Sequence, residues 1–124
     1  MSYVQGFVLP VPADKKEAYR KAAADFSPIA KEFGATRQVE AWGDDVPDGK
    51  VTDFKRSVKA TPDEAIVFSW IEYPSKEVAD KAHEKIMTDP RMKDMQMPFD
   101  GKRCLLYTSP SPRDVEESRM PSSA

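Results

Sequence analysis

The sequence predicts an α+β sandwich in which four antiparallel strands and two helices follow one another in the order βαββαβ. Two segments of strand length are apolar on both faces, and each is followed by an amphipathic segment of helix length. A more polar strand-like segment separates these two units. Because the chain has 124 residues, it is long enough for one hydrophobic core and too short for two ordinary domains.

The first strand is expected at residues 3–11, and the first helix follows it directly. Asp14 is followed three residues later by Glu17, which is the spacing of a capping box at a helix start. Aromatic and small apolar residues then recur at helical spacing as far as Gly34, which is expected to end the helix as a C′ glycine. Pro28 falls inside this helix and lacks a backbone donor, so it predicts a kink or a break just before that position.

The middle of the chain is expected to form the second strand, a turn and a hairpin arm. The alternating pattern of residues 35–42 predicts the second strand. Residues 43–50, GDDVPDGK, combine the residue types that cap, bend and permit positive φ, so they predict a turn. Residues 51–58 are expected to extend an arm of the hairpin.

The second unit of strand and helix has the strongest pattern in the chain. Residues 65–73, AIVFSWIEY, predict the third strand and carry apolar side chains on both faces. Ser75 is expected to cap a helix that Asp89 and the proline after it bring to an end. A fourth strand is expected to begin near residue 102.

This order of elements is that of a ferredoxin-like sandwich, with both helices on one face of a four-stranded antiparallel sheet. Two helices cannot cover both apolar faces of the first and third strands. An exposed apolar sheet face of this size is typical of an interface. The sequence therefore predicts a homodimer in which the two sheet faces pack against each other.

Composition limits the location of the protein and the classes of partner. Lys and Arg number 19 against 21 Asp and Glu, so the basic excess of a general nucleic-acid binder is missing and nucleic acid is not an expected partner. No apolar run approaches the roughly 20 residues of a membrane span, and the N-terminus lacks a secretory signal. We expect a cytoplasmic protein with no membrane partner. The single cysteine, Cys104, excludes an internal disulfide and a thiolate-clustered zinc site.

The end of the chain differs from the rest in composition. Written as codons, residues 104–114 resemble the transposon-end adapter of short-read DNA sequencing, and residues 115–124 resemble an index followed by the outer flank of that adapter. We therefore expect one native domain at residues 1–103 and a tail of translated adapter at residues 104–124, which truncates or replaces the last strand. The first tail residues have enough strand character to take the place of the fourth strand, and after residue 108 the tail is expected to be mostly irregular.

Five side chains are the candidates for a functional site. His83 is the only histidine and Arg37 lies on the second strand, so these two are the candidate catalytic residues. Trp42 and Trp70 are candidates to line a ligand cavity, and Arg56 is a candidate to bind an anionic ligand. Each has a structural alternative: an exposed helix position for the histidine, ion pairs for the arginines, and sheet core or dimer seam for the tryptophans.

No metal site and no cofactor are predicted. Asp44, Asp45 and Asp48 share one turn, but they lack the alternation and the distal Glu of a calcium loop, so turn roles are expected for them. The sequence also lacks a glycine-rich phosphate loop, a Ser/His/Asp set and a dinucleotide-binding fingerprint.

Five segments resemble the small bacterial domain-of-unknown-function proteins of the YbaA type, within the dimeric α/β-barrel superfamily. In order they are YVQGFVLPVP from Tyr3, GDDVPDGKVTDF from Gly43, VFSWIEYPSK from Val67, DPRM from Asp89 and MPFDGKR from Met97. Together they span nearly all of residues 1–103. The resemblance implies the ferredoxin-like fold and a dimer, and it implies no particular reaction. It also implies a last strand with glycine and aromatic residues, which is missing here.

Three functions remain open from the sequence. The favoured hypothesis is a dimeric module that binds a small-molecule ligand or a partner between its sheet and its helices. The alternative is a cofactor-independent oxygenase- or isomerase-like enzyme, which requires His83 or Arg37 to point into an enclosed pocket. A further alternative is an RNA-associated protein, which requires a contiguous Lys/Arg face and exposed aromatic side chains.

Overall fold

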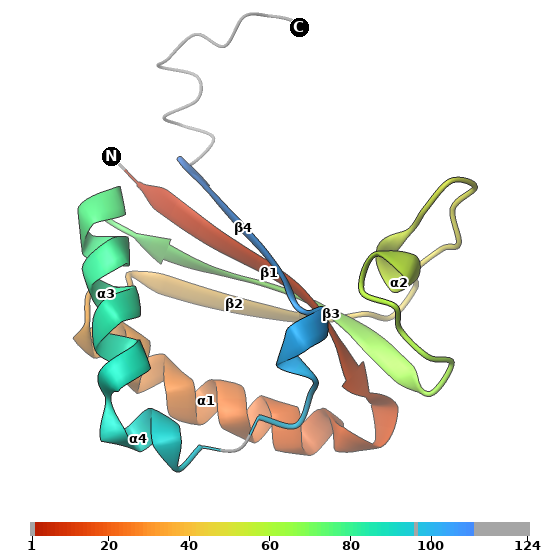
Figure 1. Ribbon diagram of the computed structural model, residues 1–124, viewed down its shortest axis with the longest axis horizontal. Coiled ribbons are helices and arrows are strands. Elements are labelled where there is room, and N and C mark those ends of the chain that lie inside the picture. The colour runs from red at the N-terminus through yellow and green to blue at the C-terminus, as the bar shows by residue number, and fades with distance from the viewer. Residues whose placement is uncertain (1, 96, 111–124) are drawn as a thin grey trace, which may run out of the picture.

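One antiparallel sheet with two long helices on one face makes up the computed structural model, which describes residues 2–95 and 97–110 (Figure 1). The strands are β1 (Tyr3–Pro12), β2 (Arg37–Trp42), β3 (Glu64–Tyr73) and β4 (Leu105–Pro110), and the helices are α1 (Lys16–Glu32), α2 (Phe54–Ser57), α3 (Lys76–Thr88) and α4 (Pro90–Lys93). The strand order is β2-β3-β1-β4. The predicted ferredoxin-like βαββαβ sandwich is therefore confirmed.

β1 and β3 form the centre of the sheet, and α1 and α3 cover one of its faces. Leu9 of β1 pairs with Val67 of β3, so both side chains point toward the helices. The buried side chains of this layer are Leu9, Val11, Val67, Ile71 and Tyr73 from the strands and Tyr19, Ala30, Ala79 and Ala82 from the helices. Phe68 and Trp70 alternate with these residues and so lie on the opposite face, which we call the open face.

The start of α1 differs from the expectation. Asp14 does not cap the helix; it lies in a 3₁₀ turn at Ala13–Lys15, and Lys15 occupies the cap position without a side-chain hydrogen bond. The backbone N–H of Ala13 donates to the carbonyl of Asp63 at 2.8 Å, which ties this turn to the segment before β3. The α-helix thus begins one residue later than the local signal predicts, after a 3₁₀ turn that this tertiary hydrogen bond holds in place.

Pro28 neither breaks nor ends α1, which is one continuous helix across it. Of the kink or break predicted from the missing N–H, the break is wrong: Ile29 and Ala30, directly after the proline, are buried, and Ala30 packs with Ile71 and Tyr73 of the sheet, which holds the second half of the helix in place. The predicted end is confirmed. Gly34 has φ +118°, a value that favours glycine, one residue beyond the C-cap.

Residues 51–58 form a loop and the short helix α2, so the hairpin arm predicted there is wrong. The carboxylate of Asp53 accepts the backbone N–H of Arg56 at 2.8 Å, which starts a helical turn in place of a strand. The loop projects from the body of the molecule beside one end of β3 (Figure 1).

The unit of β3 and α3 follows the sequence signals closely. Ser75 caps α3 and accepts the backbone N–H of Val78 at 3.2 Å, as predicted. α3 ends at Thr88 before the expected stop at Asp89, which in turn caps the short helix α4. None of the helices in the described part of the chain is long and apolar enough to cross a membrane.

β4 occupies the edge of the sheet beside β1 and consists of residues from the predicted tail. It pairs with β1 from Val8↔Leu105 to Tyr3↔Pro110. Regular structure therefore extends to Pro110, two residues beyond the expected limit at residue 108, because β1 offers pairing partners along its whole length. The rest of the predicted irregular tail, residues 111–124, lies outside the described residues.

Candidate ligand-binding cavity

A hollow lies between α1 and the helix-facing side of β2 and β3. Its outer part is a groove of about 390 Å³ between α1 and alternate residues of β2. Its inner part, which is as open to solvent as the groove, is a cavity of about 160 Å³ lined mainly by apolar side chains. Tyr19, Ala23, Gln38 and Glu40 line both parts. The groove and the cavity therefore meet at these four side chains.

Tyr19, Glu40 and Gln38 form one hydrogen-bonded cluster at this junction. The Tyr19 hydroxyl donates to Glu40 Oε1 at 2.5 Å, and Gln38 Nε2 donates to Glu40 Oε2 at 2.9 Å. Both carboxylate oxygens thus have a donor. The other end of the Gln38 amide differs: Oε1 is buried and accepts no hydrogen bond from any described residue.

Burial raises the pKa of the Tyr19 phenol well above its ordinary value of 10.0, and the hydrogen bond to Glu40 raises it further. The hydroxyl is therefore protonated at neutral pH and acts as the donor in its bond to Glu40. The cluster holds its own carboxylate in place and leaves one carbonyl oxygen without a donor.

Five aromatic residues line the hollow: Phe7, Tyr19, Phe26, Trp42 and Phe99. The ring centroids of Tyr19 and Trp42 are 6.2 Å apart, and those of Tyr19 and Phe99 are 5.9 Å apart, both in tilted arrangements. The Lys16 ammonium lies 5.7 Å from the centroid of Trp42. Aromatic walls with a few polar atoms at one point are typical of a site for a small apolar ligand.

Cys104 also lines the inner cavity. Burial raises the pKa of its thiol, so the thiol is protonated at neutral pH and is a poor nucleophile. Because Cys104 is the first residue of the predicted adapter tail, no function is assigned to it.

The sequence analysis did not single out Tyr19, Gln38 or Glu40. Tyr19 belongs to the apolar stripe of α1, and the two polar residues belong to the less apolar of the inner strands. One signal could have found them: Gln38, Glu40 and Trp42 alternate on one face of β2, and this is the face that lies under α1.

The two tryptophans lie on opposite sides of the sheet. Trp42 lines the outer groove. Trp70 lies on the open face, where its ring is 6.1 Å from that of Phe68 and its Nε1–H donates to Glu72 at 2.9 Å. Trp42 and Trp70 therefore cannot line the same cavity within one protomer.

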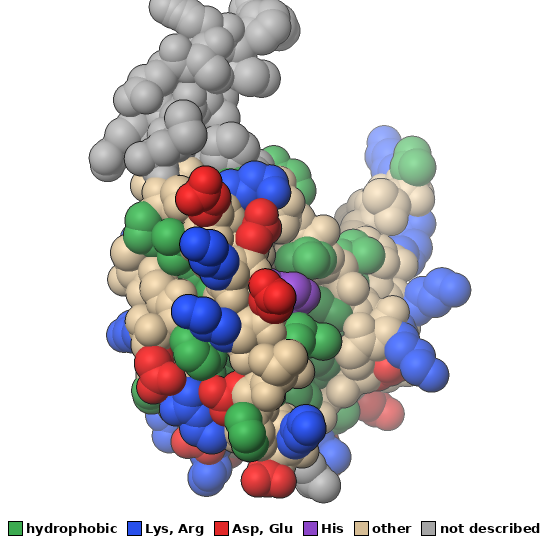
Figure 2. Space-filling model, turned by 60° about the vertical axis from the view of Figure 1, so that its left-hand side comes forward, with side chains coloured by type: hydrophobic (Ala, Val, Ile, Leu, Met, Phe, Trp, Pro, Cys, Tyr) green, Lys and Arg blue, Asp and Glu red, His purple; other side chains and the backbone are tan. Residues whose placement is uncertain are grey.

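His83 and Arg37 lie away from the hollow. His83 is exposed on α3, on a face where acidic and basic side chains are interspersed (Figure 2). Arg37 is exposed at the start of β2, and its guanidinium is 3.6 Å from the carboxylate of Glu72 on the open face. Neither side chain lines the groove or the inner cavity. The hollow therefore contains neither of the two candidate catalytic residues.

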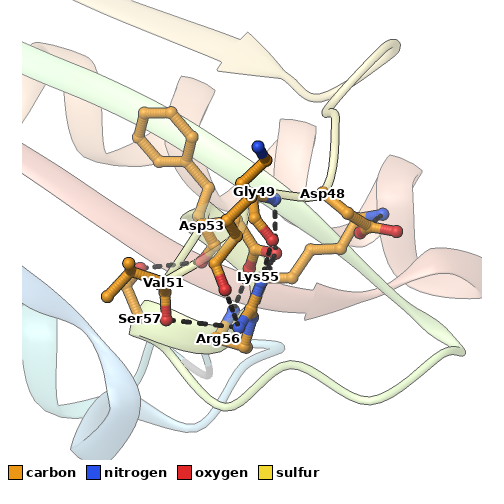
Figure 3. Close-up of polar contacts among 9 residues, drawn as sticks. Asp48, Gly49, Val51, Asp53, Lys55, Arg56 and Ser57 are labelled. Atoms are coloured by element: carbon orange, nitrogen blue, oxygen red, sulfur yellow. Dashed lines mark hydrogen bonds and ion pairs between the residues drawn. The ribbon is translucent and has the colours of Figure 1, made fainter.

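Arg56 organises the loop before α2. Its guanidinium donates to the carboxylate of Asp53 and to the carbonyls of Gly49, Lys50 and Val51 (Figure 3). The backbone N–H groups of Arg56 and Gly49 lower the pKa of Asp53 to about 2, so this carboxylate stays ionised and holds the loop closed. The N–H groups of Arg56 that an anionic ligand would need already donate to groups of the loop. Arg56 therefore has the structural alternative considered for it, an ion pair within the protein.

The described residues hold no group of three or more His, Cys, Asp or Glu side chains that could bind a metal ion. In the Asp-rich turn, the carboxylate of Asp48 lies 3.1 Å from the ammonium of Lys55. This aspartate forms an ion pair within the loop, in line with a structural role in the turn.

The sheet and its helices define a ferredoxin-like protein, and solved structures with this fold are similar to the chain. A dimeric ferredoxin-like protein from an uncultured marine organism is 14% identical, with a TM-score of 0.53, and the match covers 86% of this chain and 90% of that one. SnoaB, a cofactor-independent oxygenase from Streptomyces nogalater solved in a mutant form, is 9% identical with a TM-score of 0.50, over 90% and 93% of the two chains. At these identities the likeness shows the fold alone.

The chain belongs to the family described as protein of unknown function (DUF1428), whose model matches residues 2–101. It is similar to the uncharacterized protein YbaA of Escherichia coli strain K12, with 64% identity over 107 residues that cover 85% of this chain and 92% of that protein. The resemblance to YbaA-type proteins inferred from five sequence segments is confirmed.

Proposed function

We propose that the protein binds a small molecule in the hollow between α1 and the sheet, and that it does so as a homodimer. The observation that carries the binding role is the hollow itself, in which aromatic and aliphatic walls meet the hydrogen-bonded cluster of Tyr19, Glu40 and Gln38. The groove, at about 390 Å³, has the size of a ligand site.

Blocking the hollow from α1 tests this role. Ala23 lines both the groove and the inner cavity, so Ala23→Leu places three extra carbons where the two spaces meet. Ala18→Leu, on the exposed side of the same helix, is the matched control. The probe is N-phenyl-1-naphthylamine, a neutral aromatic molecule whose fluorescence rises in an apolar site.

We expect the unmodified protein and Ala18→Leu to bind the probe with the same Kd, and Ala23→Leu to bind at least tenfold more weakly. Far-UV circular dichroism and urea unfolding confirm that both variants are folded. Unchanged binding by a folded Ala23→Leu would contradict the proposal, because the probe would then occupy another surface.

The open face supports the dimer. Phe68 is 44% exposed there, and Phe54 of α2, 49% exposed, packs edge-on against it with ring centroids 6.3 Å apart. Trp70 lies beside Phe68 on this face, with ring centroids 6.1 Å apart, so it extends the same apolar surface. A contiguous apolar face of this kind is typical of an interface, and a two-fold axis through it covers both copies at once.

Sedimentation equilibrium at protein concentrations of about 5–50 µM tests the dimer. We expect twice the chain mass for the unmodified protein, a monomer for Phe68→Asp, and a dimer for Met87→Asp, which changes a still more exposed apolar side chain on α3. A monomeric unmodified protein, or a dimeric Phe68→Asp, would rule out this interface.

A further inference from the structure

We infer that residues 43–58, which we call the α2 loop, are a docking element that packs against a second copy of the chain. This contact rests on the proposed dimer and adds a surface outside the sheet to it. The α2 loop belongs to a connection from β2 to β3 that is longer than strand connections usually are, and long connections in compact domains often carry function. Three features point to docking: the small uncovered part of the open face, the closed geometry of the loop and its exposed valine.

The α2 loop covers one end of the open face and rises on the side of the sheet away from α1 (Figure 1). Ile66 of β3 points to the open face, as Phe68 does, yet it is only 6% exposed. Phe54 of α2 packs on Phe68, and Val58, directly after α2, is buried. The uncovered part of the open face therefore begins at Phe68 and runs along β3 to Glu72.

This uncovered part is too small for a stable interface by itself. It spans residues 68–72 of β3 and the four strands, and at about 3.4 Å per residue and about 4.8 Å between strands its footprint is about 300 Å². Even if side-chain relief doubled this area, it would fall short of the roughly 800 Å² that each partner buries in a standard interface. The α2 loop borders the uncovered part, so a sheet packed there must also contact the loop.

Polar contacts within the α2 loop hold it closed (Figure 3). The Arg56 guanidinium donates to the carbonyls of Lys50 and Val51 at 3.4 and 3.2 Å. The Asp53 carboxylate accepts from the same guanidinium at 3.0 Å and from the backbone N–H of Gly49 at 3.1 Å. Because these bonds fix the loop before a partner binds, docking costs little conformational entropy.

Val51 is the apolar side chain that this closed loop presents. It is 93% exposed, and Phe54 and Phe68 continue the apolar surface from the loop to the sheet. One exposed valine is ordinary on a protein surface, whereas a valine on a fixed loop beside an uncovered apolar face is placed for a contact. A second copy supplies that contact, because a two-fold axis that pairs the open faces brings each α2 loop against the other copy.

Val51→Asp tests the contact through the dimer Kd, measured for the full chain by sedimentation equilibrium. Two-fold symmetry repeats the contact, so the substitution acts twice, and we expect the Kd to rise at least about tenfold. Met87→Asp, which changes an exposed apolar side chain on α3, should leave the Kd unchanged.

Arg56→Met tests the closed geometry, because it removes the guanidinium that holds the α2 loop. We expect the dimer Kd to rise at least about threefold as the loop becomes free to move. Arg91→Met is the matched control: Arg91 also donates to the aspartate that caps its own short helix, and it lies on α4, away from the open face. Urea unfolding of each variant establishes that it is folded.

A spin label at position 51 tests the contact directly. Val51→Cys in a Cys104→Ser background is labelled with a nitroxide and mixed with an equal amount of unlabelled, isotope-enriched chain. We expect broadened amide signals from the open face or the α2 loop of the enriched chain. A label at Met87→Cys in the same background should broaden none of these signals.

The results separate the docking role of the α2 loop from the proposed dimer. If the unmodified protein is a dimer that Phe68→Asp dissociates, an unchanged Kd in folded Val51→Asp or Arg56→Met, or an absence of broadened partner signals, would each overturn the docking role and leave the dimer standing. If the unmodified protein is a monomer, both are overturned.

Discussion

The ion pair between Glu64 and Arg103 joins the first residue of β3 to the turn before β4 and makes stability depend on pH. Arg103 Nη1 and Nη2 lie 2.7 and 2.6 Å from the two carboxylate oxygens of Glu64, a bidentate arrangement. Hydrogen bonds from Arg103 lower the pKa of Glu64 from its ordinary value of 4.5 to about 2. Stability from this pair is therefore present above pH 4.5 and is lost as the pH falls toward 2.

The size of the effect follows from the geometry. A lowering of this extent corresponds to at most about 3 kcal/mol, and solvent screening at the quarter-exposed Arg103 side chain reduces it to about 1–2 kcal/mol. We expect Glu64→Gln to lower the unfolding free energy by this amount at pH 7. As the pH falls from 5 to 2, the unfolding free energy of Glu64→Gln should decrease less than that of the unmodified protein. Glu84→Gln, at an exposed position of α3, is the control.

Urea unfolding followed by circular dichroism at pH 7, 5, 4 and 3 measures the difference. Other carboxylates with a lowered pKa, such as Asp53, titrate in both proteins and cancel in the comparison. Parallel stability curves for the unmodified protein and Glu64→Gln across this range would refute the reasoning, as would an equal loss in Glu84→Gln.

Three further predictions concern the cluster, the helix end and the tail. Tyr19→Phe removes the donor to Glu40 and should lower the unfolding free energy by about 2 kcal/mol in urea unfolding, whereas a change below about 0.5 kcal/mol would show that this bond adds nothing. Gly34→Ala should cost about 2 kcal/mol or more, because φ is +118° and the new Cβ would lie 2.4 Å from Val78 Cγ1, while Gly101→Ala, with no atom within 4 Å, should be tolerated within about 0.5 kcal/mol. Sequencing the source gene across the Arg103 codon from DNA prepared without transposon adapters should give a different continuation after residue 103, and an uninterrupted frame with this tail would contradict the adapter origin.

Structural features that depend only on a few adjacent residues were predicted correctly from the sequence. Gly34 ends α1 and Ser75 begins α3 because a positive φ and a side-chain cap are properties of one or a few adjacent residues. The same local reasoning failed where a distant contact competes with it. Asp14 loses its capping role to a turn tied to Asp63, and Pro28 is carried through the helix by burial of the residues after it.

The prediction for the loop before α2 was wrong for a similar reason. Residues 51–58 have the composition of a strand arm, but Arg56 draws four groups of this loop onto one guanidinium, and that geometry requires a closed loop. The sequence shows that Asp53 and Arg56 are three residues apart, and it does not show that the carbonyls of Gly49 to Val51 will turn toward them.

The sequence by itself determined the order of the elements, the two apolar faces of β1 and β3, and membership of the family, because periodicity and segment matches are carried by the chain alone. Only the tertiary structure decided which face of β2 lies under α1, and hence that Trp42 borders the hollow while Trp70 lies on the open face. It also decided that Tyr19 meets Glu40 across 21 positions of the chain, with Gln38 beside them. Alternation in a strand defines two faces without saying which one the helices cover; packing and register make that choice, and the candidate site follows from it.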